Sequence, residues 1–340
     1  MSEIDFVIPW VDGNDPAWRR AFAEQRHADA ADKDASAARH AAGEDASEIR
    51  YRDWRTLRYW FRSTERFAPW VRRIHFITWG HLPEWLATDH PQLHVVEHAD
   101  YLPEAYCPTF NSNALELNIH RIAGLSEQFV LFNDDTFLGR PARPTDFFRD
   151  RLPRDMASLS LPALEPIAHI ILNNLMLING CYRPHTVISR NPVKWLSPRY
   201  GGGNVLKTLL LLPWSNFPGI RDHHMPQAFS KKSFEMAWER WGEALDATCR
   251  NRFRTTNDVS QWLIRYDALC RGAFRPIGFG DCRQMTLTDN NKPICRAIET
   301  QCYRMFCLHD AERITDFEAV SAQLCAAFER LLPEKSAFEK

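Results

Sequence analysis

The chain has 340 residues, of which 45% are hydrophobic and 12% aromatic, which is enough for one large α/β domain or two smaller ones. Its 42 basic and 43 acidic residues nearly cancel, so no global positive field favours a nucleic acid partner. The first five residues have neither a basic nor an apolar segment, so we expect no secretory signal and predict a cytoplasmic protein. The nine cysteines form no C-x-x-C pair and fit reduced thiols better than a structural zinc site.

Strands and helices are expected to alternate in the first 150 residues. Strands are predicted over residues 4–11, 73–80, 93–98 and 129–132, and helices over about 53–67 and 113–125. This alternation indicates an α/β fold with a mostly parallel, Rossmann-like sheet flanked by helices. Residues 17–48 are rich in Ala, Asp, Arg and His and polar almost all round, which predicts a helical insert at the surface.

The second half of the chain, from residue 151 onward, is predicted to be rich in helices. An apolar helix is expected over residues 167–178, a flexible glycine joint at 201–203, a helix over about 232–246 and a helix start within 252–258. The apolar run 206–214 has two interpretations, core packing or peripheral contact with the inner membrane, and we favour core packing.

Polar residues gather where the predicted strands end. Asp12 and Gly13 follow the first strand, and Asn133, Asp134 and Asp135 follow the fourth. Open α/β sheets bind ligands outside the carboxyl ends of their strands. Two adjacent carboxylates repel each other, but at such an edge they can hold a hard cation against phosphate oxygens. The alternative is an ordinary polar turn, for which Asn-Asp is common.

The helix predicted over residues 53–67 has an arginine face. Arg55, Arg58, Arg62 and Arg66 recur at steps of three and four, with Glu65 as the acidic residue among them. Such a stripe is usually a solvated face, but guanidinium groups suit phosphate recognition. We therefore expect at least one of these arginines to bind an anion.

Several segments resemble motifs of the Stealth family, which includes bacterial capsular polysaccharide phosphotransferases and the catalytic subunit of the animal N-acetylglucosamine-1-phosphotransferase. Residues 4–16 resemble the first conserved region of that family. The other similar segments are residues 50–71, 108–122 and 133–135 for the second region, 224–226 and 254–258 for the third, and 307–310 for the fourth. His309 stands where the fourth region usually has Asn.

The resemblance implies a single catalytic domain over residues 1–340. In it, a GT-A-like half (residues 1–150) binds a nucleotide sugar and the helix-rich half (151–340) completes the active site. The implied reaction moves a hexose or N-acetylhexosamine 1-phosphate from a UDP-sugar to a hydroxyl of a capsular or cell-surface polysaccharide or a lipid-linked glycan. A phosphodiester forms and UMP leaves.

The resemblance also implies roles for individual residues. His224 is the expected base, Arg254 a catalytic cation, and Asp135, alone or with Asp134, the ligand of Mg²⁺ or Mn²⁺. The expected substrate-binding residues are Trp10, Asp12, Gly13, Arg58, Arg62, Asn111, Ser112, Glu116, His120 and Asp258.

Two other functions remain open from the sequence. A metal-dependent GT-A-type glycosyltransferase would use similar carboxylates and release UDP instead of UMP. A non-catalytic sugar-binding protein would need none of the catalytic residues. Neither the sugar, the acceptor nor the oligomeric state follows from the sequence.

Overall fold

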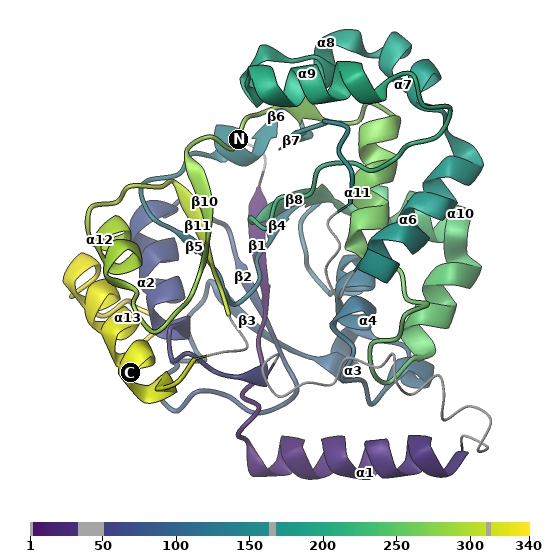
Figure 1. Cartoon of the computed structure of the whole chain (residues 1–340). Helices are drawn as coiled ribbons and strands as arrows, with labels where there is room; N and C mark the ends of the chain where they lie inside the picture. The colour runs from purple at the N-terminus through teal and green to yellow at the C-terminus, as the bar shows by residue number, and fades with distance from the viewer. Residues whose placement is uncertain (1–2, 33–50, 163–167, 311–313) are drawn as a thin grey trace.

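The fold is built on a five-stranded sheet with helices on both faces (Figure 1). The computed structural model describes residues 3–32, 51–162, 168–310 and 314–340. The strand order is β3 (Leu93–Glu97), β2 (Ile74–Thr78), β1 (Ile4–Pro9), β4 (Gln128–Leu131) and β8 (Gln227–Ser230). The first four strands are parallel and β8 is antiparallel to β4. This confirms the predicted Rossmann-like sheet.

Strand β1 is buried on both faces, as expected for a central parallel strand. Ile4, Phe6 and Ile8 pack into one hydrophobic cluster and Val7 packs into another. Asp5 is the polar exception, and its carboxylate accepts hydrogen bonds from Arg72 Nε at 2.8 Å and the Ser126 backbone at 2.8 Å. Burial alone would raise the pKa of Asp5, but bonds to His75 and Arg72 outweigh it and lower the pKa to about 2.

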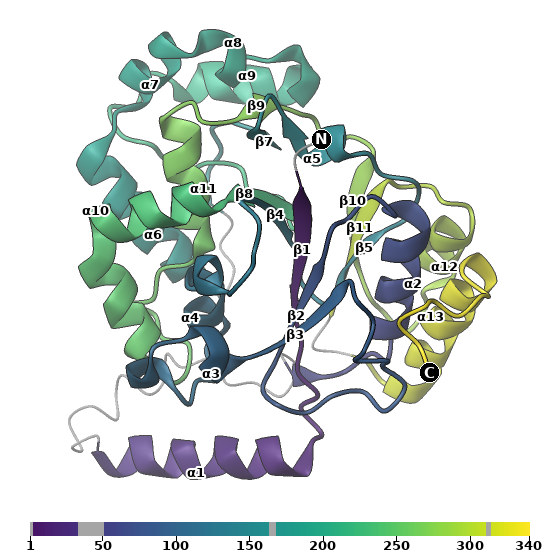
Figure 2. The ribbon, with the colours of Figure 1, turned by 180° about the vertical axis from the view of Figure 1, so that it is seen from behind.

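Two helical layers cover opposite faces of the sheet, and Figures 1 and 2 show them on opposite sides of β1. One layer holds α2 (Leu57–Phe67), α12 (Lys292–Glu299) and α13 (Phe317–Leu331), together with a second sheet of β10 (Cys282–Thr286), β11 (Met305–His309) and β5 (Thr136–Leu138). The other holds α3 (His98–Tyr101), α4 (Ser112–Leu117), α6 (Ala168–Cys181), α10 (Lys231–Arg250) and α11 (Gln261–Cys270).

Smaller elements lie at the two ends of the molecule. At one end are α5 (Pro144–Phe147), α7 (Pro184–Arg190), α8 (Pro192–Trp195), α9 (Gly202–Leu211) and a third sheet of β6 (Phe148–Arg149), β7 (Leu152–Asp155) and β9 (Arg275–Pro276). Helix α1 (Pro16–Asp32) lies at the opposite end in both views. Short 3-10 helices span Glu104–Tyr106, Ile119–Arg121 and Pro198–Tyr200.

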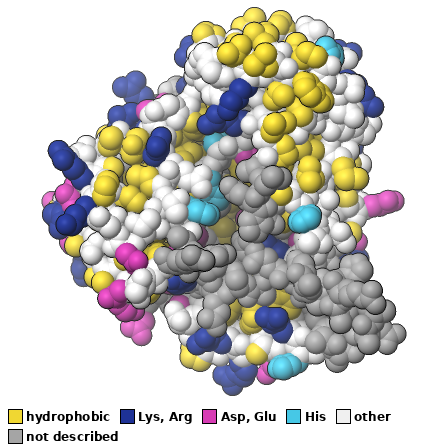
Figure 3. Space-filling model, in the orientation of Figure 1, with side chains coloured by type: hydrophobic (Ala, Val, Ile, Leu, Met, Phe, Trp, Pro, Cys, Tyr) yellow, Lys and Arg dark blue, Asp and Glu magenta, His cyan; other side chains and the backbone are white. Residues whose placement is uncertain are grey.

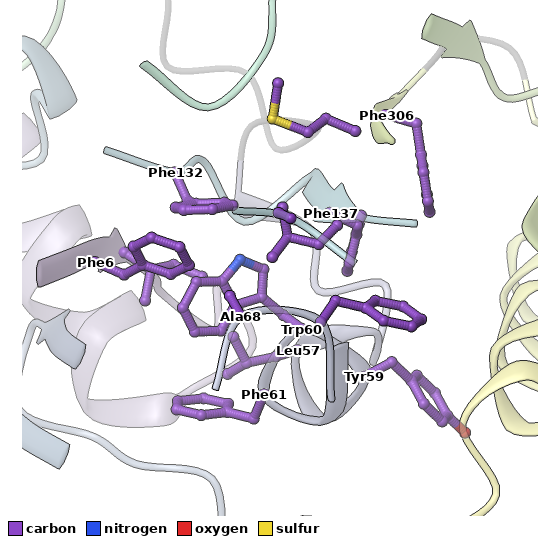
Figure 4. Packing of buried hydrophobic residues seen from close by; sticks show 14 of the residues in the cluster. Phe6, Leu57, Tyr59, Trp60, Phe61, Ala68, Phe132, Phe137 and Phe306 are labelled. Carbon is purple, nitrogen blue, oxygen red and sulfur yellow. The ribbon is translucent and has the colours of Figure 1, made fainter. Parts of the chain in front are cut away.

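An aromatic core lies directly under the end of β4. Phe132 packs on Phe6, with ring centroids 4.7 Å apart, and edge-on to Trp60 of α2 at 5.3 Å (Figure 4). Phe137, which begins the path into the second sheet, is also fully buried and packs on Phe306 at 5.5 Å. The intervening residues Asn133 to Asp135 are therefore held between two buried aromatic anchors.

The largest differences from the predicted elements occur where polar side chains bind the backbone. The helix expected over residues 113–125 ends at Leu117, because Asn118 turns its side chain back to the Ala114 carbonyl at 2.8 Å. The helix start expected within 252–258 is wrong, since α11 begins only at Gln261. The helical insert is confirmed for α1, and residues 33–48 of it lie outside the described part.

The flexible glycine joint expected at residues 201–203 is wrong, and the core packing expected for residues 206–214 is confirmed only for Leu211 and Leu212, which pack against the core. Gly201 has φ of +80° and turns the chain directly into α9, whose first residues are Gly202 and Gly203. Helix α9 packs through buried Thr208, whose hydroxyl accepts a bond from the Leu159 backbone at 3.1 Å. Leu206, Leu209 and Leu210 of α9 face outward, with Leu210 64% exposed. In the described residues, no helix is both long and apolar enough to cross a membrane.

The anion-binding role predicted for Arg62 is wrong. Its side chain is 5% exposed and donates to both carboxylate oxygens of Glu339, at 2.7 and 2.9 Å. It also donates to Glu329 at 2.9 Å and to the Leu332 carbonyl at 2.7 Å. With its donors used in this way, Arg62 anchors α13 and the residues after it to α2.

Replacing Arg62 with Met should destabilise the fold by about 3 kcal/mol, because Glu339 would keep a buried carboxylate without its partner. Urea unfolding monitored by circular dichroism measures this change. Arg330 of α13, 59% exposed and paired with Glu299, is the matched control. Arg330→Met should change the free energy of unfolding by less than about 1 kcal/mol. Equal effects of the two substitutions would contradict the assigned role of Arg62.

Candidate active site

The candidate site lies where the carboxyl ends of β1 and β4 meet the amino end of β8. Because β8 is antiparallel and pairs Gln227 with Leu131, it brings the residues before it next to the residues after β4. His224 therefore reaches the turn formed by Asn133, Asp134 and Asp135. Figure 3 shows histidine side chains in the middle of this face, between the two helical layers.

Asp135, His224 and Cys307 form the centre of the site. Asp135 Oδ2 lies 3.3 Å from His224 Nε2 and accepts a bond from Cys307 Sγ at 3.2 Å. Cys307 comes from β11, which pairs with Thr136 of β5. The Asp135 carbonyl also accepts from the Leu308 backbone at 2.8 Å, which fixes this residue to the second sheet.

The two charges of the centre stabilise each other. Burial alone would raise the pKa of Asp135, but the positive charge and hydrogen bond of His224 lower it below its usual value. Burial alone would lower the pKa of His224, but Asp135, Glu116 and Asp134 raise it above its usual value. The imidazole is therefore poised to carry a proton near neutral pH.

Asp134 differs from its neighbour. It reaches solvent, but desolvation by the surrounding protein and the negative charges of Asp135 and Asp53 raise its pKa to about 7. The Asp53 carboxyl also has a raised pKa, through burial and the nearby charge of Asp12. Carboxylates from three segments thus crowd one edge of the sheet, and this excess negative charge favours a cation there.

A second wall of the site comes from α4 and the loop before α11. Arg254 donates to the Ser112 hydroxyl at the first residue of α4. Glu116 is 7% exposed, and its burial raises the pKa to about 7, while the charges of Arg254 and His224 oppose that rise. The structure thus brings together Ser112, Glu116, His224 and Arg254, as predicted.

The end of β1 supplies the remaining predicted residues. The Asp12 backbone donates to His81 Nε2 at 2.8 Å, and its carboxylate accepts from the Asn14 backbone in the turn. Gly13 lies against the Tyr51 backbone, where an added Cβ would come within 2.4 Å of the carbonyl oxygen. Trp10 is 8% exposed and stacks on Phe76, so it forms part of the floor beneath this turn.

Asn111 and Asp258 hold the architecture and do not face a substrate, contrary to the prediction. Both are fully buried, and Asn111 Nδ2 donates to Asp258 Oδ2 at 2.8 Å. Asp258 also accepts from Asn251 at 2.8 Å and from the Thr255 backbone and hydroxyl at 3.1 and 2.8 Å. A buried carboxylate requires such donors, and together they fix the loop that carries Arg254.

His120 and Arg58 also lie elsewhere than predicted. His120 packs against Phe234 and Trp238 of α10, and burial lowers its pKa to about 4, so it stays neutral in an apolar environment. Arg58 lies over the ring of Trp85, 5.5 Å from the centroid, and next to Cys325 of α13. The spacing of His120 and Arg58 in the sequence could predict the helix face on which each lies. It could not predict which residues pack against that face.

A buried ionic network behind His224 was missed by sequence reasoning. Arg265 of α11 donates to Asp155 at 2.8 Å and to Asp222 at 2.9 Å, and His223 lies 3.1 Å from Asp155. Arg265 is 1% exposed. The network ties residues 222 and 223 to α11 and β7, and so positions His224. An arginine directly between Ile264 and Tyr266, within a mostly apolar segment, was the sequence signal for it.

The side chains of Asp135, His224 and Cys307 offer one oxygen, one nitrogen and one sulfur ligand, whereas the predicted cation is Mg²⁺ or Mn²⁺. One ligand atom from each of Asp135, His224 and Cys307 lies within 4.8 Å of the others, and this mixed set is typical of zinc more than of magnesium. Mg²⁺ prefers oxygen ligands. Asp135 Oδ1 is buried without a hydrogen-bond partner in the described residues, so an oxygen ligand beside Asp134 is available.

Comparison with known proteins identifies related sequences. Family models for conserved regions 1, 2 and 3 of Stealth proteins match residues 2–24, 50–155 and 223–265. A capsular polysaccharide phosphotransferase (WcwK) of Streptococcus pneumoniae is 36% identical over 100% of this chain and 99% of its own. An exopolysaccharide phosphotransferase (cps2G) of Lactiplantibacillus plantarum is 38% identical over 99% and 96%. A receptor polysaccharide phosphotransferase (WefC) of Streptococcus gordonii is 34% identical over 100% and 99%.

Replacing Glu116 with Gln should stabilise the protein at pH 8 but not at pH 4. Folding raises the pKa of Glu116 from 4.5 to about 7, so the folded state holds this proton more tightly than the unfolded state. Stability is therefore lost as the pH rises from the lower value to the higher one. The amide removes this loss, and the gain at pH 8 should be roughly 2 to 3 kcal/mol. Urea unfolding at both pH values measures it, and a gain independent of pH would contradict the assignment.

Proposed function

The chain belongs to the Stealth family of polysaccharide phosphotransferases, and we propose that it transfers a sugar 1-phosphate from a UDP-sugar to a hydroxyl of a polysaccharide or lipid-linked glycan. The relatives named above act, by their names, on capsular, exopolysaccharide and receptor polysaccharides. The transferred group is a hexose or N-acetylhexosamine 1-phosphate. The acceptor oxygen bonds to phosphorus, the bond from phosphorus to the UMP oxygen breaks, and the sugar keeps its anomeric bond.

The observation that carries this proposal is the pairing of His224 with Asp135. His224 Nε2 faces the lowered-pKa carboxylate of Asp135, so Nε2 holds a proton and Nδ1 is left to accept one. The acceptor hydroxyl gives its proton to Nδ1 as its oxygen attacks. Asp135 then stabilises the imidazolium that forms, which is consistent with the raised pKa of His224.

Arg254 has a different role in the proposed reaction. Its guanidinium, fixed by Ser112, lies on the wall opposite the carboxylates and supplies positive charge for the transferring phosphoryl group. The charges of Arg254 and His224 both act to lower the pKa of Glu116, so the two cationic groups lie in one site. In-line phosphoryl transfer depends on positioning and on charge stabilisation of this kind.

We include Mg²⁺, or Mn²⁺ in its place, in the proposal. Asp134 and the unpartnered Oδ1 of Asp135 are the residues that would hold it, and the crowding of carboxylates around them supports this choice. When bound, the cation neutralises charge on the phosphoryl oxygens and the leaving UMP. His224 and Cys307 stay with Asp135 Oδ2, where they hold the carboxylate in place.

The reaction is tested by product analysis with a panel of UDP-sugars and a glycan acceptor. Chromatography should show UMP and a phosphodiester product. Release of UDP without UMP would instead identify a GT-A-type glycosyltransferase. His224→Asn should lower kcat by about 10²- to 10⁴-fold, since it removes the base. His120→Asn, which lies outside the site, should leave kcat nearly unchanged and is the matched control. Unchanged product formation by His224→Asn would favour a protein without this catalytic site.

Removal of divalent cations with EDTA should abolish UMP release, and added Mg²⁺ should restore it. Isothermal titration should show that Asp134→Asn and Asp135→Asn each weaken Mg²⁺ binding. The cause is the loss of a charged oxygen ligand at an edge where Asp53 remains. Full activity in EDTA, with no Mg²⁺ binding by the unaltered protein, would remove the cation from the mechanism.

A further inference from the structure

An apolar patch covers the end of the molecule formed by α8, α9 and the turn after α9. It consists of Val193, Leu206, Leu209, Leu210 and Trp214, which are 81%, 56%, 47%, 64% and 57% exposed. The three leucines recur at steps of three and four, so they share one face of α9. Figure 3 shows apolar side chains grouped at this end. Scattered apolar residues are ordinary, but a grouped set of this size with Trp marks an interaction surface.

The segment that carries the apolar patch has charged residues of one sign only. Residues 168–221 contain six Lys and Arg residues and no Asp or Glu, although the whole chain has a net charge of -1. Arg190 of α7, Arg199 of the 3-10 helix between α8 and α9, and Lys207 of α9 are all exposed. Basic residues thus border exposed leucines and a tryptophan. This combination is typical of surfaces that lie in the interface of an anionic membrane.

A second copy of the chain fits the apolar patch less well. A symmetric dimer through this end would place the basic borders of both copies against each other. Like charges at such an interface repel, and the acid-free stretch from residue 168 to 221 offers no carboxylate to compensate them. An anionic surface instead gains from both the positive charge and the apolar side chains.

We propose that the apolar patch docks this protein on an anionic lipid bilayer. Leu206, Leu210 and Trp214 enter the boundary between headgroups and acyl chains, and Lys207 and Arg199 lie at the level of the lipid phosphates. This is peripheral contact along one face of a short helix. It does not depend on the reaction proposed above.

Helix α6 lies between the apolar patch and the candidate active site. Its Leu172 and Met176 are 46% and 73% exposed, which adds apolar surface. Between them, Asn173 donates to the carbonyls of Thr256 and Asp258 at 2.8 and 2.9 Å. Those residues belong to the loop that carries Arg254. Helix α6 therefore joins the apolar surface to one wall of the candidate site.

Vesicle flotation with the full chain tests the proposal. The protein should float with vesicles of phosphatidylglycerol in phosphatidylcholine, and less with phosphatidylcholine alone or at high salt. A double variant, Leu210→Asn with Trp214→Ala, should bind the anionic vesicles at least about tenfold more weakly, because it removes two groups that enter the interface. Lys207→Glu should weaken binding and reduce its salt dependence.

Leu82, an apolar residue 40% exposed outside the apolar patch, provides the matched control, and Leu82→Asn should bind like the unaltered protein. Circular dichroism and Tm should show that every variant keeps its fold. The proposal fails if the unaltered protein does not bind anionic vesicles. It also fails if the double variant binds these vesicles as tightly as the unaltered protein does. It also fails if sedimentation velocity shows a dimer that the double variant converts to a monomer, since the apolar patch would then join two copies.

Discussion

The structure depends on one constrained passage, in which the chain leaves the five-stranded sheet and enters the second sheet within the residues after β4. Phe132 is buried on the near side of this passage and Phe137 on the far side, so neither end can shift without exposing an aromatic ring. The backbone between them is closed by bonds between Asn133 and Thr136 at 3.0 Å. Asp134 and Asp135 are thus fixed at the junction of two sheets, and the rest of the site assembles around them.

Burial favours the neutral form of each acid near this junction, and the partner charges decide whether that effect is reversed. Asp135 faces an imidazole and a thiol, and its pKa is lowered. Desolvation raises the pKa of Asp134 to about 7, and the charges of Asp135 and Asp53 add to that rise. Desolvation also raises the pKa of Glu116 to about 7, because the opposing charges of Arg254 and His224 are too weak to reverse it. One small region therefore holds an ionised carboxylate beside two groups that can exchange protons near neutral pH.

Periodicity and turn chemistry were sufficient to predict strands β1 to β4 and their polar ends, but not β8. The family resemblance, and not periodicity, singled out Asp135, His224 and Arg254. Both were insufficient for Arg62 and Asp258, because each of these two residues is satisfied by donors or acceptors that sequence spacing does not reveal. The partner of Arg62 is 277 residues away, and the donors to Asp258 come partly from its own loop and partly from Asn111. An arginine stripe on a helix looks the same whether solvent, phosphate or a second helix covers it.

The separation of Asp135, His224 and Cys307 along the chain has a consequence for synthesis of the protein. Asp135 is synthesised long before His224, and Cys307 comes from β11, near the other end of the chain. The cluster thus draws on segments separated by 172 residues. A nascent chain that has emerged only as far as β5 presents Asp134 and Asp135 without His224 and without the Cys307 thiol. The protonation pattern that distinguishes Asp134 from Asp135 arises only once the last strand of the second sheet has been translated and paired.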